Sequence, residues 1–205
     1  MKYLLILLSF TGLVHAEPTW VMTKCSAPLS YCVEFDCIQD AVLTAKVVRS
    51  GLFTPRYYYD LYSPEGTFLA RGINRVFSLG LFIPSQMEFD IYDETNAYIG
   101  YIGGKFWTRG AAFGFGNPHG TEVGSALLSS DSDQAIFSIL SPTNKVMATL
   151  NGMLSGDLSN WELDVKKPLD IDSRVLKIFT AFISDFHKCF IRKPEIYIIT
   201  PTNNK

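Results

Sequence analysis

The stretch Pro168-Leu169-Asp170-Ile171-Asp172, followed by SRVLKIFTAFISDF from Ser173 to Phe186, decides the fold. It is the only long helix-patterned segment after the first sixteen residues, and what precedes it is typical of short strands. Apolar side chains, with Phe179, Phe182 and Phe186 among them, cover most of the helix circumference. A helix that is apolar on nearly all sides is normally buried. We therefore expect a core helix near residues 171–188.

The ends of this segment also favour a helix inside a protein core. Asp170 or Asp172 suits the N-cap, while His187 and Lys188 suit the negative end of the helix dipole. The longest uncharged run, residues 178–184, has seven residues, whereas a membrane span needs about 20. The pattern thus predicts a buried helix rather than a membrane anchor.

Three strand pairs of similar spacing precede the helix. Each pair surrounds a short polar turn at 63–66, 93–96 or 141–144, and in the first turn Pro64 and Gly66 suit a type I turn. This repetition predicts an antiparallel meander. The paired segments are 57–62 with 67–71, 87–92 with 97–102, and 134–140 with 145–150. Further strands are expected at 31–38, 41–49 and 161–165, and residues 194–199 have strand composition.

The first sixteen residues have the layout of a cleavable secretory signal. Lys2 is followed by an apolar run, and Val14 and Ala16 occupy the −3 and −1 positions. We therefore expect export to the periplasm or the exterior. We divide the remainder into an irregular segment at 17–30, one folded domain at 31–190 and a tail at 191–205.

The overall charge argues against nucleic acid as a partner. The formal charge is −2, hydrophobic residues make up 47% of the chain, and no block of like charges occurs. Strong attraction to nucleic acid or to an anionic membrane needs a basic excess. We expect a monomer that needs no cofactor to fold.

Four cysteines, Cys25, Cys32, Cys37 and Cys189, follow the predicted signal. An even number in an exported chain predicts two disulfides, with three possible connectivities. Cys32 and Cys37 point to opposite faces if 31–38 is one straight strand. We expect Cys189 to pair with Cys25 or Cys37. Free buried thiols are the alternative.

Catalytic and metal-binding motifs are missing from the sequence. No GxSxG, HExxH or phosphate-loop pattern occurs, which predicts a protein that is not an enzyme. The acids and amide at Asp157, Asn160, Glu162 and Asp164 form a weak calcium candidate without the glycine and final glutamate of an EF-hand loop. A solvated strand edge is the simpler interpretation, and we predict no metal.

The glycine-rich passage 103–120 is the best binding candidate. It interleaves basic and aromatic side chains, a combination that meets lipid headgroups while the rings settle at a membrane interface. The simpler alternative is that the rings point into the core and the glycines allow tight packing. The candidate lipid-binding residues are Lys105, Trp107, Arg109, Phe113 and Phe115.

Four short matches give the chain a family resemblance. They are Tyr92-Asp93, Tyr98-Ile99-Gly100, the stretch 168–172 and Ala181-Phe-Ile-Ser-Asp-Phe186. On these residues the chain, from about 56 to 188, resembles the tubby C-terminal-like superfamily, in particular its phospholipid-scramblase and LURP-one-related branch. The resemblance implies a mainly β fold, a closed antiparallel barrel of about twelve strands wrapped around a buried C-terminal α-helix.

The resemblance and the residues lead to two functional hypotheses. The first is an exported, non-enzymatic barrel that binds membrane lipid, such as phospholipid headgroups, at a surface. The second is a scaffold that binds a partner protein and no lipid, because one barrel architecture serves unrelated functions. A basic set matching the phosphoinositide-binding residues of tubby proteins does not align here.

Overall fold

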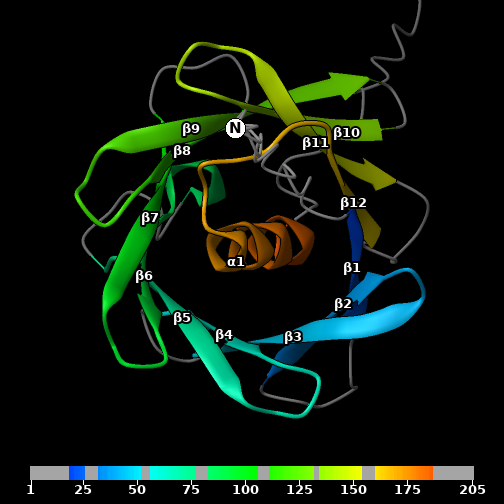
Figure 1. The fold of residues 1–205 in the computed structure, drawn as a ribbon, viewed down its shortest axis with the longest axis vertical. Helices are drawn as coiled ribbons and strands as arrows, with labels where there is room; N and C mark the ends of the chain where they lie inside the picture. The colour runs from blue at the N-terminus through cyan, green and yellow to red at the C-terminus, as the bar shows by residue number, and fades with distance from the viewer. Residues whose placement is uncertain are drawn as a thin grey trace, which may run out of the picture.

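Twelve antiparallel strands close into a barrel, and the single α-helix of the described chain lies inside the ring (Figure 1). The computed structural model describes residues 19–25, 32–51, 56–76, 83–105, 111–131, 134–153 and 160–186. The predicted fold class is confirmed.

The elements are β1 Trp20–Cys25, β2 Val33–Gln39, β3 Val42–Ser50, β4 Tyr58–Tyr62, β5 Phe68–Asn74, the short 3-10 helix η2 Pro84–Gln86, β6 Glu88–Asp93, β7 Tyr98–Gly104, β8 Ala112–Gly116, β9 Glu122–Asp131, β10 Gln134–Leu140, β11 Val146–Met153, β12 Asn160–Val165 and α1 Ser173–Asp185.

Strand β1 closes the barrel by pairing with both β2 and β12. Met22, in its middle, lies opposite Cys37 on one side and Trp161 on the other. The prediction of an irregular segment at 17–30 was therefore wrong for residues 20–25. Six residues are a weak alternation signal beside Pro18 and Pro28, but pairing on both edges satisfies the backbone of so short a strand.

Four hairpin turns of the barrel share one hydrogen-bonding pattern. The first side chain of each turn, Ser63, Asp93, Asn117 or Ser141, accepts a hydrogen bond from the backbone N–H four residues later. The fourth residue, which is Gly or Asn, has a positive φ of 59–88°. Three of these turns were predicted as the turns of hairpins. The fourth, Asn117-Pro118-His119-Gly120, joins β8 to β9 and follows the same sequence pattern.

Aromatic rings from the strands surround the helix. Phe179 packs within 5.4 Å of Phe113 and 5.0 Å of Phe115, measured between ring centroids. Phe182 lies 5.1 Å from Phe89 and 5.6 Å from Phe113. Both helix residues are fully buried, as predicted, whereas Phe186 is half-buried at the helix end. Offset and edge-to-face rings of this kind add to the free energy gained from buried area.

The helix begins as the sequence predicts, but the described helix is shorter than 171–188. Asp172 is the N-cap, and its side chain accepts a 2.8 Å hydrogen bond from the backbone N–H of Arg174. Thr180, buried inside the barrel, donates from Oγ1 to the carbonyl of Leu176 over 2.8 Å. The hydroxyl of this buried residue thus has a hydrogen-bond partner within the helix and needs none from the strands.

Several predictions concern residues outside the description. These are the signal at 1–16, the strand at 194–199, the tail at 191–205 and most of the irregular segment. Within the described ranges, the single α-helix is too short to cross a bilayer.

Candidate functional site

Two of the five predicted lipid-binding residues lie in the core. The side chains of Phe113 and Phe115, on β8, are fully buried and pack on Phe179 of the helix. Their rings therefore do not form a surface that contacts lipid, and this part of the prediction was wrong. Trp107 and Arg109 lie outside the described residues.

The glycines of β8 explain why the sequence pattern was misleading. Gly114 and Gly116 alternate with the two phenylalanines, so they face the outside of the barrel. The ring of Tyr101 lies directly over Gly116, and the side chains of Lys105 and Glu122 lie over Gly114. Lys105 Nζ donates to Glu122 Oε1 over 2.6 Å. Lys105 is thus paired on the barrel surface.

The calcium candidate is a row of side chains on the outside of β12. Asn160 and Glu162 are exposed and Asp164 is half-buried, each two residues from the next. Asp157 lies outside the description. Within the described ranges, no three His, Cys, Asp or Glu side chains come together as metal ligands.

The prediction that Cys25 or Cys37 forms a disulfide with Cys189 was wrong. Cys25 and Cys37 carry free thiols. Cys25 Sγ lies 3.4 Å from Asp36 Oδ2 on the outside of the wall, whereas Cys37 is buried against the core. Adjacent strands place these two thiols on opposite faces, so they cannot bond to each other. Cys32 is half-buried, and Cys189 lies outside the description.

An outer face of aromatic and arginine side chains covers β4–β7. We call it the aromatic–arginine face, and it consists of Tyr58, Tyr62, Phe68, Arg71, Arg75, Tyr92 and Tyr98. Arg71 makes a bidentate ion pair with Asp60, with Nε–Oδ1 and Nη2–Oδ2 distances of 2.6 and 2.9 Å. The same guanidinium lies 5.5 Å from the ring of Tyr58 and 5.7 Å from that of Phe68. The bidentate ion pair and the two cation–π contacts fix the arginine in one orientation.

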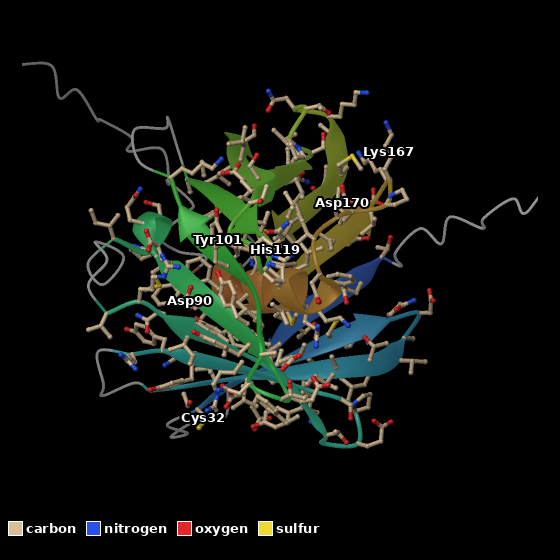
Figure 2. All side chains as sticks on the ribbon, turned by 60° about the vertical axis from the view of Figure 1, so that its left-hand side comes forward. Cys32, Asp90, Tyr101, His119, Lys167 and Asp170 are labelled. Carbon is tan, nitrogen blue, oxygen red and sulfur yellow. The ribbon has the colours of Figure 1, made fainter. Side chains whose placement is uncertain are left out.

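The second half of this face repeats the arrangement. Arg75 makes a bidentate ion pair with Asp90, with Nε–Oδ2 and Nη2–Oδ1 distances of 2.9 and 2.6 Å. Its Nη1 donates to Glu88 Oε2 over 3.0 Å. The rings of Tyr92 and Tyr98 pack edge to face at 5.7 Å. Asp90 and the neighbouring Tyr101 lie on the outer side of β6 and β7 (Figure 2). The five aromatic rings of the face are half-buried, although they point away from the core.

Two hollows of modest size adjoin these features. One, of about 190 Å³, lies on the aromatic–arginine face between Arg56, Arg75, Asp90 and Tyr92. The other, of about 270 Å³, lies at the start of the helix, where Asp170, Asp172 and Arg174 approach Asn117. Arg174 already binds Asp172 and Glu94 there, so its charge is balanced.

A cluster of ionisable side chains lies at the other end of the helix. Asp185 accepts hydrogen bonds from Lys24 Nζ at 3.0 Å, Arg49 Nε at 2.9 Å and the Tyr59 hydroxyl at 3.1 Å. We call these four residues the Asp185 cluster. Burial and the Asp185 carboxylate raise the pKa of Tyr59 well above its usual range, so its hydroxyl stays protonated. The cluster joins β1, β3 and β4 to the helix.

Sequence patterns did not predict the aromatic–arginine face or the Asp185 cluster. Tyr58 and Tyr62 occupy alternate positions of a predicted strand, and this spacing is the one available signal for the face. The members of the cluster are between 126 and 161 residues from Asp185.

Comparison with known proteins identifies no relative. The chain matches no family model, no curated protein and no solved structure.

Proposed function

We propose that this chain is an exported, monomeric, non-enzymatic barrel that binds a partner protein through its aromatic–arginine face. The observation that carries the proposal is the set of five half-buried rings on the outer side of β4–β7. Tyrosine and arginine are the residue types that most often dominate binding energy at protein interfaces. The barrel interior is filled by the helix and its aromatic neighbours, so binding takes place on the outside.

The charges of this face favour a protein over a lipid surface. Arg71 pairs with Asp60, and Arg75 pairs with Asp90 and Glu88. A face whose cations are matched by carboxylates has little net attraction for anionic headgroups. Phospholipid binding through 103–115 is less favoured because Phe113 and Phe115 are buried.

Membership of the tubby C-terminal-like superfamily is part of the same proposal. Its support is the closed twelve-stranded barrel with an internal helix that begins after Pro168-Leu169-Asp170-Ile171-Asp172. Function does not follow from this architecture, and for that reason the proposed partner class rests on the aromatic–arginine face.

Site-specific photocrosslinking tests the proposal. Benzoylphenylalanine replaces Tyr62 or Tyr98 in the full chain, expressed in its native compartment. The matched control replaces Val146, which is 42% exposed on β11, across the closed ring from β5. We expect one protein adduct of the same mass from positions 62 and 98, and none from 146.

The partner isolated from that adduct then gives a quantitative test. Tyr98→Ala should weaken its binding by about tenfold or more, as removal of an interface anchor does, whereas Val146→Ala should leave it unchanged. Adducts of equal yield at all three positions would contradict the proposal. Lipid adducts at 62 and 98, with retention on phospholipid vesicles, would replace the protein partner with a membrane.

A further inference from the structure

Arg49 differs from the other arginines with described ion pairs in how it meets its carboxylate. Arg71, Arg75 and Arg174 each place Nε and Nη2 on one carboxylate. Arg49 donates to Asp185 from Nε, and the other carboxylate oxygen accepts from Lys24. The Nη1 side of the Arg49 guanidinium is therefore left for a different acceptor.

The remaining edge of Arg49 is buried. The residue is 7% exposed, and its Nη1 is buried with no hydrogen-bond partner among the residues that the structure describes. A buried, unpaired N–H costs about 1–3 kcal/mol, more when it carries charge. Native proteins rarely keep such a group without a bound water or ion to satisfy it.

The charge of the Asp185 cluster is positive. Lys24 and Arg49 contribute two positive charges, Asp185 contributes one negative charge, and Tyr59 is neutral. A carboxylate on the last residue of a helix is unfavourable for the helix dipole. Its place there is explained if Asp185 holds two cations toward a ligand of the opposite charge.

We propose that Arg49 Nη1 and Lys24 Nζ bind a compact oxyanion of the phosphate type at the end of the barrel where helix α1 finishes. Each nitrogen belongs to a side chain fixed by one oxygen of the same carboxylate, so both cations are held at the same end of the barrel. Arginine and lysine together are the usual phosphate ligands in proteins. Lys24, which is 22% exposed, connects the site to solvent. This site is separate from the aromatic–arginine face and does not depend on the proposed function.

Thermal unfolding of the full chain in inorganic phosphate at constant ionic strength tests the site. We expect a saturable rise in melting temperature for the wild-type protein, since a ligand that binds only the folded state stabilises it. Arg49→Lys keeps the charge but removes Nη1, and the rise should disappear. Arg75→Lys, a matched change on the outer surface, should keep the rise.

Lys24→Gln keeps the proposal testable if Arg49→Lys fails to fold. It leaves the Arg49–Asp185 bond in place and should weaken phosphate binding about tenfold, as loss of one charge-assisted hydrogen bond does. No saturable rise in the wild-type protein, or an equal rise in wild type and Lys24→Gln, would overturn the proposal.

Two further experiments distinguish a lipid headgroup from a soluble phosphate ester as the ligand. Vesicles that contain phosphatidic acid should retain the wild-type protein, and free phosphate should release it, if the ligand is a lipid headgroup. Glycerol phosphate that raises the melting temperature, with no retention on those vesicles, identifies a soluble phosphate ester. Both results require Arg49, so each is repeated with Arg49→Lys, and binding that survives this change would overturn the site.

Discussion

Arg49 on β3 donates a hydrogen bond from Nε to Oδ2 of Asp185 over 2.9 Å, which ties the barrel wall to the last residue of its central helix. The side chains of the two residues are only 9% and 6% exposed. Lys24 and Tyr59 bind the same carboxylate from β1 and β4. One buried charge thus connects three strands of the wall to the helix.

We expect Asp185→Asn to lower the free energy of unfolding by about 3 kcal/mol, because it leaves Arg49 and Lys24 without their counter-charge in a buried site. Urea unfolding of the two proteins measures the difference. Glu94→Gln is the control, since Glu94 is 54% exposed and lies 3.5 Å from Arg174. An exposed pair contributes about 0–1 kcal/mol. Equal losses in the two variants would show that the Asp185 cluster does not anchor the helix.

Phe182→Ala should be among the most damaging changes in the chain. The ring is fully buried, with Phe89, Phe113 and Tyr59 around it. Its removal should cost about 3–5 kcal/mol, which is a large part of the stability of most domains. Phe186→Ala, at the half-buried helix end, should cost less. A Phe182→Ala protein that melts like wild type would be incompatible with a helix packed inside the barrel.

Local periodicity predicted most of the elements. The helix and nine of the strands were anticipated because their patterns repeat within a few residues. Strand β8 was missed because its outward positions are Gly114 and Gly116, which resemble a loop until Tyr101 is found to cover one of them. Strand β9 was missed because serines interrupt its alternation.

The candidate site could be predicted much less well than the fold. Phe113 was assigned to a lipid surface because its passage combines aromatic residues with glycines and basic residues. Such a sequence is compatible both with a core strand and with a membrane interface. The Asp185 cluster has no local signal, because closure of the barrel brings residues 24, 49 and 59 to the helix end. A strand pattern identifies which side of the wall a residue faces only when the strand itself is recognised.

Gly100 should tolerate substitution less well than Gly66. Both have a positive φ, +152° and +88°, a region that costs an L-residue about 1–2 kcal/mol. A Cβ on Gly66 meets nothing within 4 Å, whereas a Cβ on Gly100 would overlap the backbone carbonyl oxygen of Gly116. We expect Gly66→Ala to cost about 1 kcal/mol and Gly100→Ala to cost about 1–3 kcal/mol more. Chemical denaturation compares them, and equal costs would refute the tight β7–β8 packing.

The thiols of Cys25 and Cys37 should react with iodoacetamide at very different rates in the folded protein. Cys37 is fully buried, so its alkylation requires opening of the barrel. Cys25 is half-buried on the outer side of the wall, and burial together with Asp36 raises the pKa of its thiol. Because the thiolate is the reactive form, its alkylation should increase with pH and reach its midpoint above that of a free cysteine.

Asp36→Asn isolates the cause of that shift. The change removes the neighbouring carboxylate, so the pKa of Cys25 should fall and its alkylation at neutral pH should become faster. Peptide mapping of the labelled protein assigns each rate to its residue, and Cys37 should remain slow in both proteins. If Cys25 resists alkylation in the denatured, unreduced chain, it is held in a disulfide after all. Rapid labelling of native Cys37 would instead place that thiol outside the core.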